Sequence, residues 1–401
     1  MSKAMFFNVP AHGHINPTLP LVRELVKRGD KVIYYATEEF KGKIEETGSL
    51  FQAYGLPNDK NYHPAANILM LAEMLLDTTS ELLPQLVKVV QDEHVDYIIH
   101  DSMCLWGRVV ARVLNLPAIC STSTFAMNRS VVNSMYRHSP EGIKNFLRAV
   151  FTSSLSLFRT RYKMNRLAKE YGVEISLVSI FSNPSDLNIV YTSKELQPYA
   201  ESFDERYCFV GPSISFRKES ADFPLHKLEN RTVIYVSLGT VRNNRFDFYR
   251  ECISQLGNTE YLIVISVGRN MNTTDLGELP ENVLVYNHVP QLKVLQMAKG
   301  FISHGGMNSV QEGLYFGVPL LLFPQTEEQE LVARRVEAFG AGRVIKERDL
   351  ESAKLLGIVN MFLDDESYLQ STQKLQKSLH SSGGYKRAAD KIEEFKGIYI
   401  R

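Results

Sequence analysis

Residues 5–36 of the chain read MFFNVPAHGHINPTLPLVRELVKRGDKVIYYA. Two short runs rich in aromatic and β-branched residues, 5–9 and 32–36, enclose a segment in which apolar residues recur at helical spacing. We expect that helix to begin near Asn16-Pro17 and to end at Gly29. A strand, a helix and a second strand in this order are typical of parallel strands joined by a crossover helix, so the fold class is α/β.

The same alternation continues along the chain in two series. Further strands are predicted at 97–100, 118–121 and 187–191, and then at 232–237, 262–267, 283–286, 300–303 and 319–323. Residues 211–230 are polar, rich in turn residues and without periodicity, as expected for an interdomain linker. Because 401 residues exceed what one core usually holds, we expect an N-terminal domain at 1–210 and a second domain at 231–383.

The net charge and the hydropathy of the chain restrict the kinds of partner that we expect it to bind. The 45 Lys and Arg residues balance 45 Asp and Glu residues, so no net field attracts the chain to nucleic acid or an anionic surface. No apolar run approaches the roughly 20 residues of a spanning helix. The first residues, MSKAMFFNVP, lack a signal-peptide pattern. We expect a cytoplasmic protein with small-molecule partners, without nucleic acid or integral membrane association.

The cysteines give no sign of a disulfide or a zinc site. No two of them form a CxxC pair, and none lies in a cluster with histidine. They are Cys104, Cys120, Cys208 and Cys252.

Two histidines follow the first predicted strand directly. In a doubly wound sheet the end of that strand borders the ligand site, and His14 could take a proton from a hydroxyl there or merely cap a helix. Only Gly13 stands where a dinucleotide fingerprint needs three glycines, which argues against a nicotinamide enzyme. Asp101, at the end of the strand predicted at 97–100, could orient His14 or could be an ordinary turn residue.

A second candidate site follows the strand predicted at 300–303. Residues 304–312 read HGGMNSVQE and open a helix. Backbone N–H groups at a helix start, together with close-approaching glycines, a histidine and a serine, suit a pyrophosphate without a metal ion. Glu312 could accept ribose hydroxyls. Ser309-x-x-Glu312 is also a capping box, which needs no ligand.

Two further strand ends carry polar groups suited to the same ligand. Gly239 and Thr240, after the strand at 232–237, could approach phosphate or sugar oxygens. Residues 323–329 read FPQTEEQ, and their acidic and amide groups suit sugar hydroxyls. Thr326-x-x-Gln329 could equally be a capping box at a helix start.

Together these residues resemble the two-domain nucleotide-sugar glycosyltransferases of family one, in particular the bacterial macrolide and flavonoid glucosyltransferases. The similarity covers nearly the whole chain. Each motif is short, and their order gives the resemblance its specificity. The ordered motifs are Gly13-His14-x-x-Pro17, Ser237-x-Gly239-Thr240, Val289-Pro290-Gln291, His304-Gly305-Gly306-x-Asn308-Ser309-x-x-Glu312, Gly317-Val318-Pro319 and Glu328-Gln329.

The resemblance implies a GT-B fold, in which two Rossmann-like doubly wound domains face each other across a cleft. It places the acceptor in the N-terminal domain and the nucleotide-sugar donor in the C-terminal domain. A last helix at 384–401 would cross back onto the N-terminal domain. No cofactor or metal is implied, because the UDP-sugar is a co-substrate.

The resemblance also assigns roles to individual residues. His14 would be the general base and Asp101 its partner. The donor-binding residues would contact the uracil, the diphosphate, the ribose and the sugar in turn. They are Val289 and Gln291 for the uracil; His304, Asn308 and Ser309 for the diphosphate; Glu312 for the ribose; and Glu328 and Gln329 for the sugar. Gly239, Thr240 and Gly306 are further candidate donor-binding residues.

Three positions depart from the family pattern. Plant relatives carry a tryptophan on the uracil where this chain has Val289 or a neighbour, and Met307 replaces another plant tryptophan. The selectivity for uridine could therefore be looser than in plants. His12 is not part of the shared pattern, and we expect it to be less suited than His14 to act as the base.

The reaction implied is a single in-line displacement giving a β-glycoside. A sugar-nucleotide epimerase of the same fold would need acidic catalytic groups, and an inactive sugar-nucleotide-binding protein would lack the His14–Asp101 pair. The acceptor stays open. Residues 62–76 and 125–158 are rich in Met, Leu and Phe, which predicts a roomy apolar pocket. The basic segment 139–169 could be a membrane-surface helix or a helical pair beside that pocket.

Overall fold

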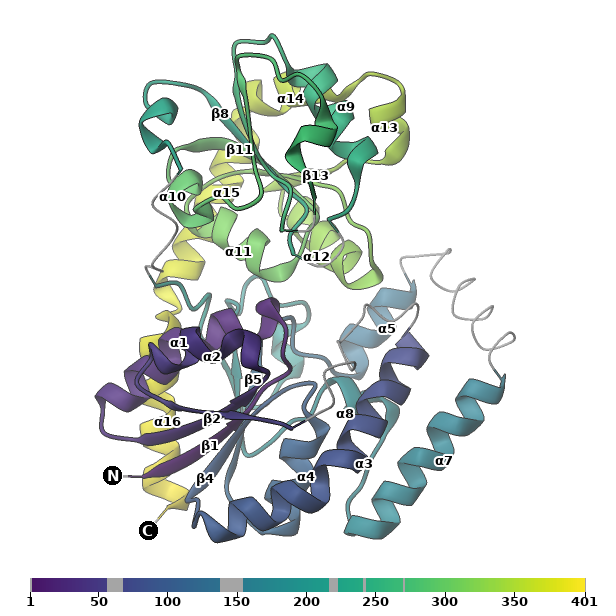
Figure 1. Ribbon diagram of the computed structural model, residues 1–401, viewed down its shortest axis with the longest axis vertical. Coiled ribbons are helices and arrows are strands. Elements are labelled where there is room, and N and C mark those ends of the chain that lie inside the picture. The colour runs from purple at the N-terminus through teal and green to yellow at the C-terminus, as the bar shows by residue number, and fades with distance from the viewer. Residues whose placement is uncertain are drawn as a thin grey trace. The chain divides into compact units, whose positions relative to one another are not determined.

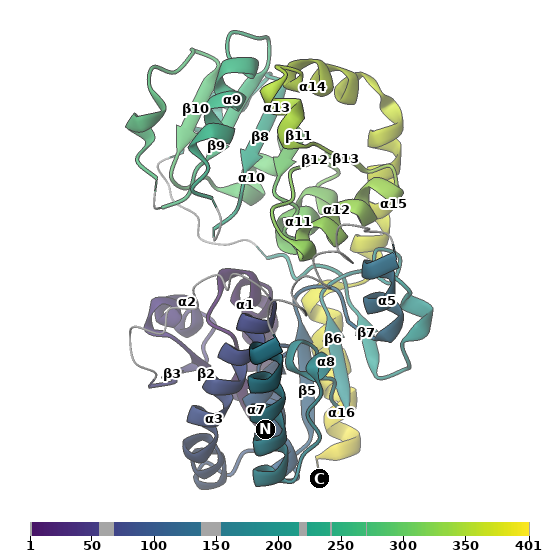
Figure 2. The same ribbon diagram turned by 90° about the vertical axis from the view of Figure 1, so that its right-hand side faces the viewer.

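The computed structural model describes residues 2–55, 68–137, 154–215, 223–240, 243–269 and 271–400. The chain divides into two compact units, which are Met1–Ile214 with Ser382–Arg401, and Ser215–Ser381. Each unit contains its own parallel sheet packed by helices (Figure 1 and Figure 2). The α/β class predicted from the alternation of strands and helices is therefore confirmed.

The sheet of the first unit has seven strands in the order β3-β2-β1-β4-β5-β6-β7, and all neighbours run parallel. The order reverses between β1 and β4. Ligands of doubly wound proteins bind beyond the carboxyl ends of the strands at such a switch point. The strands are β1 (Lys3–Phe7), β2 (Lys31–Ala36), β3 (Leu50–Ala53), β4 (Tyr97–Asp101), β5 (Ala118–Thr122), β6 (Leu187–Val190) and β7 (Tyr207–Phe209).

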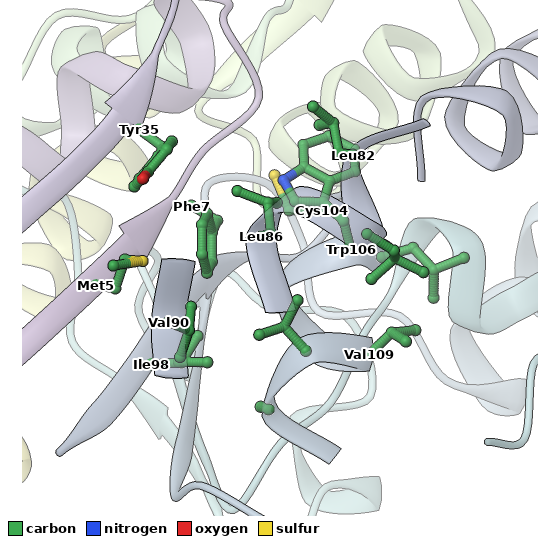
Figure 3. Packing of buried hydrophobic residues seen from close by; sticks show 14 of the residues in the cluster. Met5, Phe7, Tyr35, Leu82, Leu86, Val90, Ile98, Cys104, Trp106 and Val109 are labelled. Atoms are coloured by element: carbon green, nitrogen blue, oxygen red, sulfur yellow. The ribbon is translucent and has the colours of Figure 1, made fainter. Parts of the chain in front are cut away.

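Strand β1 is buried on both faces because its side chains alternate between two helical layers. Met5 and Phe7 pack with α3 and α4, as Figure 3 shows. Ala4 and Phe6 pack with α1 and α16 on the other face. The helices of this unit are α1 (His12–Lys27), α2 (Lys41–Glu45), α3 (Ile68–Asp92), α4 (Leu105–Val113), α5 (Arg129–Arg137), α7 (Ser154–Tyr171), α8 (Leu177–Phe181) and α16 (Gly384–Tyr399), with short 3-10 turns at Glu38–Phe40 and Ala200–Ser202.

Helix α1 begins earlier than predicted, at His12 rather than near Asn16-Pro17. The carbonyl of Ala11 accepts from the N–H groups of His14 and Ile15, which closes the first turn before the proline. Pro17 then lies inside the helix, where its ring is buried and removes one backbone hydrogen bond. The earlier start matters because it makes His14 part of the first helical turn.

A buried ion pair attaches α16 to the first unit. Nζ of Lys396 lies 2.8 Å from Oδ1 of Asp30, and the hydroxyl of Tyr97 donates to Oδ2 of Asp30 across 2.8 Å. Burial alone would lower the pKa of Lys396, but hydrogen bonds to Asp30 and Glu393 outweigh it and raise the pKa. Removing one partner of such a pair typically costs about 3–5 kcal/mol, because the other charge stays buried. The last helix is therefore firmly attached to α1 and its neighbours.

The basic segment 139–169 is described from residue 154 onward, where it forms α7. This helix packs along α3. Nζ of Lys163 lies 2.8 Å from Asp77, and the hydroxyl of Ser156 donates to Glu73. The described part of the segment is thus one of a pair of helices, and residues 139–153 lie outside the described residues.

The sheet of the second unit has six parallel strands in the order β10-β9-β8-β11-β12-β13, with its switch point between β8 and β11. The strands are β8 (Val233–Ser237), β9 (Leu262–Ser266), β10 (Val283–Tyr286), β11 (Ala298–Ser303), β12 (Leu320–Leu322) and β13 (Gly342–Val344). The helices are α9 (Phe246–Leu256), α10 (Gln291–Leu295), α11 (Met307–Tyr315), α12 (Glu327–Ala338), α13 (Glu347–Glu351), α14 (Leu355–Asp364) and α15 (Glu366–Ser381), with 3-10 turns at Leu225–Leu228 and Thr273–Leu276.

No helix in the described ranges is long and apolar enough to cross a membrane.

Candidate active site

His14 and Asp101 come together at the switch point of the first sheet. His14 lies in the first turn after β1, and Asp101 is the last residue of the neighbouring strand β4. Nδ1 of His14 is 2.8 Å from Oδ2 of Asp101. The Asp101 side chain is 1% exposed and that of His14 is 20% exposed. The second carboxylate oxygen of Asp101 accepts from the N–H of Met103 across 2.8 Å, so both oxygens are held.

The contact determines which imidazole nitrogen carries the proton. An ionised carboxylate can only accept hydrogen bonds, so Nδ1 of His14 must donate to Asp101. The neutral ring therefore presents the lone pair of Nε2 on its opposite side. Asp101 orients the imidazole and would stabilise the imidazolium, as a carboxylate does in a catalytic triad.

A third side chain, Ser123, reaches the same nitrogen. Its Oγ is 3.2 Å from Nδ1 of His14. Because Ser123 and Asp101 share one ring nitrogen, this serine cannot be the nucleophile of a hydrolase triad, which would need the other nitrogen. Ser123 belongs to no recognised motif. It directly follows β5, the neighbour of β4, so its position at a strand end was the signal that could have identified it.

Four titratable groups buried near Asp101 are uncharged at neutral pH. Burial lowers the pKa of His100 to about 4, and its ring contacts Oγ of Ser185 at 2.7 Å. Burial raises the pKa of Cys120 to about 12 and also raises that of Cys104 and of Tyr191. The carboxylate therefore stands among neutral side chains, next to a histidine that can become positive.

His12, whose role stayed open, contacts other residues than His14 does. Its Nε2 lies 3.2 Å from Oε1 of Glu39, and its ring meets the ring of Phe40 edge-on with centroids 4.9 Å apart. These contacts attach the start of α1 to the turn after β2. His14, and not His12, contacts the buried carboxylate.

Asn8 is a buried residue at this site that carries no sequence motif. Its amide nitrogen lies 2.6 Å from the hydroxyl of Tyr34 and 3.2 Å from the carbonyl of His14. The backbone carbonyl of Asn8 accepts from the hydroxyl of Tyr54 across 2.9 Å. Asn8 thus holds the first turn of α1 to the end of β1.

In the second unit, two neighbouring strands are each followed by a turn of the same kind. Ser237 and Ser303 are register partners on β8 and β11. Each hydroxyl accepts from the N–H of the glycine two residues later, Gly239 or Gly305, across 3.3 Å. Both glycines have positive φ, 79° and 81°, which other residues rarely adopt. The paired turns place two glycine-containing segments side by side.

The ring of His304 fills the space beside these glycines. A Cβ atom at Gly239 would lie 2.6 Å from Cε1 of His304, and one at Gly306 would collide with Nε2. A side chain at either position would therefore have to displace the ring of His304. Burial lowers the pKa of His304 to about 4, partly offset by the backbone of Ser237, so the ring is neutral at pH 7. The ring of His304 can therefore form a hydrogen bond with a ligand but carries no positive charge at pH 7.

Helix α11 starts at this point, and Glu312 faces a different helix. Gly306 is the N-cap and Ser309 is already the third residue of the helix, so the capping-box alternative for Ser309-x-x-Glu312 is wrong. Nε2 of Gln291, the first residue of α10, donates to Oε2 of Glu312 across 2.6 Å. The hydroxyl of Tyr235 donates to Oε1 of Gln291 across 3.1 Å and so orients the amide.

At the start of α12 the structure shows one half of the capping box that Thr326-x-x-Gln329 could form. Thr326 is the N-cap, and its hydroxyl accepts from the N–H of Gln329 across 3.3 Å. Oε1 of Gln329 accepts from the N–H of Gln325 across 2.8 Å. Glu328 is exposed. Gln329 therefore has a structural role whether or not it contacts a sugar.

Comparisons with known proteins agree along the whole chain. The model of the erythromycin biosynthesis protein CIII-like C-terminal domain matches residues 250–395. The uncharacterized UDP-glucosyltransferase YojK of Bacillus subtilis is 34% identical over 98% of this chain and 97% of its own length. The NDP-glycosyltransferase YjiC of Bacillus licheniformis is 35% identical over 97% and 96%. The chain belongs to this family of nucleotide-sugar glycosyltransferases.

The fold of the glycosyltransferase is that of the family. The crystal structure of the glycosyltransferase of kitacinnamycin aligns with a TM-score of 0.84 and 30% sequence identity, over 98% of both chains. The calicheamicin glycosyltransferase CalG4 aligns with a TM-score of 0.83 and 27% identity over the whole of both chains. The two sheets are thus the two Rossmann-like domains of a GT-B enzyme, as the resemblance implied.

The two residues that stand where plant relatives carry a tryptophan, Val289 and Met307, are core residues. The side chain of Val289 is 2% exposed and that of Met307 is 5% exposed. Val289 can therefore offer a uracil its main chain rather than its side chain. Asn308 and Ser309 lie in the first turn of α11, close to Gly306, and Thr240 is exposed after β8.

The apolar segments expected around the acceptor are described only in part. Leu75 and Leu76 of α3 belong to the core beneath the sheet, and Phe125 is 1% exposed. These three apolar residues are buried in the interior of the protein. Residues 62–67 and 138–153 lie outside the described residues.

All four cysteines of the glycosyltransferase are free thiols. Across the described parts of the chain, no three His, Cys, Asp or Glu side chains are grouped to hold a metal ion. Metal independence stays a prediction.

Proposed function

We propose that the enzyme transfers glucose from UDP-glucose to a hydroxyl group of a small, largely apolar acceptor such as a macrolide, a flavonoid or another phenolic compound. The product would be a β-glycoside. The observation that carries the proposal is the 2.8 Å contact between His14 and the buried carboxylate of Asp101. Acceptor binding would belong to the unit containing β1, and donor binding to Ser215–Ser381.

In the proposed reaction, Nε2 of His14 takes the proton of the acceptor hydroxyl. The acceptor oxygen forms a bond to C1 of the glucose, the bond between C1 and the phosphate oxygen breaks, and UDP leaves with that electron pair. Attack from the side opposite the leaving group inverts an α-linked donor to a β-glycoside. Asp101 stabilises the imidazolium that forms, and a positioned base typically contributes about 100- to 10,000-fold to the rate.

On the donor side, the proposal assigns the diphosphate to the start of α11 and the glycine turn after β8. The N-terminus of a helix carries roughly half a positive charge and presents free N–H groups, which suits a leaving diphosphate without a metal ion. Glu312 would accept the ribose hydroxyls, oriented by Gln291. Two relatives, one named as a UDP-glucosyltransferase and one as an NDP-glycosyltransferase, support a nucleotide-sugar donor.

The competing activities account less well for the His14–Asp101 pair. An epimerase has no acceptor hydroxyl to deprotonate, and a protein that only binds a sugar nucleotide needs no oriented base. The erythromycin-related family model and the structure of the kitacinnamycin glycosyltransferase support an acceptor of natural-product type.

The test is to incubate the protein with UDP-glucose and a panel of macrolides, flavonoids and simple phenols in the presence of EDTA. Mass spectrometry should detect products heavier by one hexose, and NMR of a purified product should show the β anomer. Other nucleotide sugars offered in parallel would define the donor. An α-linked product, a requirement for added divalent cation, or product from other donors but never from UDP-glucose would contradict the proposal.

A further inference from the structure

The base of the proposed reaction has two hydrogen-bond partners on one nitrogen. Nδ1 of His14 lies 2.8 Å from Oδ2 of Asp101 and 3.2 Å from Oγ of Ser123. Asp101 ends β4, and Ser123 follows β5, the next strand of the sheet. The two partners therefore approach the imidazole from different elements. Ser123 is 6% exposed, so its hydroxyl is fixed within the protein.

The direction of the second hydrogen bond follows from the first. Because the carboxylate can only accept, the hydrogen lies on Nδ1. A nitrogen that carries a hydrogen cannot accept from a hydroxyl, so Oγ of Ser123 must accept a share of that hydrogen. Such bifurcated hydrogen bonds are common in proteins.

We propose that Ser123 is a positioning residue for the base, whose hydroxyl oxygen shares the Nδ1 hydrogen of His14 with Asp101. This inference rests on the proposed role of His14. A second acceptor, placed directly after the neighbouring strand, restricts rotation of the imidazole about the N–H direction and helps to hold the plane of the ring. The direction in which Nε2 meets an acceptor hydroxyl is thereby fixed.

Ser123 would also act on the charge that His14 gains during transfer. A hydrogen bond to a charged donor is stronger than one to a neutral donor, so Ser123 stabilises the imidazolium more than the neutral ring. Loss of the hydroxyl should therefore lower the pKa of His14. It should also slow proton removal from the acceptor.

The titratable groups that interact with Asp101, and His12 on the same helix as His14, do not reverse this sign. On β4, Asp101 is the charged neighbour, and burial keeps His100 neutral by lowering its pKa to about 4. On β5 and directly after β6, burial raises the pKa of Cys120 and of Tyr191, so both stay neutral. Burial likewise raises the pKa of the Cys104 thiol before α4. His12 lies at the start of α1, 3.2 Å from the carboxylate of Glu39 in the turn after β2. All of these remain in a Ser123 variant.

The test compares Ser123→Ala and Ser123→Cys with the parent enzyme. Cysteine fills the space of the serine but accepts hydrogen bonds only weakly, so it separates hydrogen bonding from packing. Ser121→Ala is the matched control, because this buried serine on β5 donates to Tyr191 and not to His14. Two readouts are needed: the pH dependence of kcat with a weakly acidic alcohol, and the ¹⁵N NMR titration of the His14 ring without substrate.

Both Ser123 variants should lower kcat about three- to tenfold and leave the KM for UDP-glucose unchanged. The acid limb of the profile and the NMR titration of His14 should move to lower pH by about half a unit. Ser121→Ala should match the parent. An unchanged titration of His14, a change in KM alone, or a parent-like profile for Ser123→Cys would overturn the inference.

The NMR titration separates this inference from the proposed function. If His14 is not the base, the acid limb of kcat will not follow its titration in the parent. The titration of His14 should still shift in the Ser123 variants if the two side chains share the hydrogen.

Discussion

The side-chain amide of Gln291 donates to the carboxylate of Glu312 across 2.6 Å, although the two residues belong to different helices, α10 and α11. Glu312 is only 4% exposed, so its carboxylate needs such partners. The hydroxyl of Tyr235 binds the other end of the amide and fixes which way it points. Gln291 and Glu312, which belong to different family motifs, are therefore joined by a hydrogen bond.

Replacing Glu312 by alanine should weaken UDP and UDP-glucose to the same extent, because the ribose is common to both. A lost hydrogen bond to a charged group is worth roughly 1.5–3 kcal/mol, or about ten- to a hundredfold in Kd by calorimetry. Gln291→Ala should change both affinities in the same direction, and the double variant should be less than additive because the residues touch. A lower melting temperature with unchanged affinities would make the pair purely structural.

His14→Ala should abolish transfer to a weakly acidic alcohol and leave the affinity for UDP within a few-fold of the parent. The base belongs to the first unit, whereas the predicted nucleotide site belongs to the second. Loss of a general base typically costs about 100- to 10,000-fold in rate. A strongly acidic phenol is the control acceptor, since it needs little help in losing its proton and should retain more activity. Substantial transfer to the alcohol would exclude His14 as the base.

Asp101→Asn should keep the fold and lose much of the rate. The amide has nearly the shape of the carboxylate, but it cannot stabilise the imidazolium, and it can present an N–H to Nδ1 and so favour the wrong tautomer. The measurement is kcat together with a thermal melt. Parent-like activity in a folded variant would show that Asp101 only shapes the turn after β4.

The two-sheet organisation could be predicted because most strands are buried on both faces and so appear as continuous apolar runs. Three edge strands, β3, β7 and β13, have only three or four residues each and were not predicted. The hydrophobic pattern of three or four residues is too short to distinguish a strand from a turn. The start of α1 was misplaced because proline at a first helical position is a strong general signal, whereas here the turn closed by Ala11 precedes it.

The strand-end rule was informative for the site because it depends only on topology. It selected His14 and Asp101, 87 residues apart, and the structure brings them into contact. Ser123 and Tyr235 were missed because serine after a strand and tyrosine within one are ordinary residues. Each is distinguished by a hydrogen bond to a residue far away in the sequence, His14 for Ser123 and Gln291 for Tyr235. No single stretch of sequence shows such a contact.

The enzyme should lose stability in mild acid because of His100. Burial lowers its pKa from 6.5 to about 4, so between these values the unfolded chain binds a proton that the folded chain excludes. The free energy of unfolding should therefore be unaffected by this residue above pH 6.5 and fall by up to about 1.4 kcal/mol per pH unit below it. Denaturant unfolding of the parent and of His100→Gln at pH 7 and pH 5 would measure this. Equal losses in both proteins would assign the acid sensitivity to other groups.

The side chain of Gln329 accepts a hydrogen bond from the backbone N–H of Gln325. Gln329→Ala should lower the melting temperature slightly, since one hydrogen bond is worth roughly 0.5–1.5 kcal/mol. If Gln329 also contacts the sugar, the variant should weaken UDP-glucose and spare UDP. Thr326→Ala is the matched control, because it removes the cap of α12, at a typical cost of about 1 kcal/mol, and leaves the glutamine in place. A loss of UDP-glucose affinity in Gln329→Ala and not in Thr326→Ala would assign the amide to the sugar. Equal affinities in all three proteins would leave Gln329 as part of the cap alone.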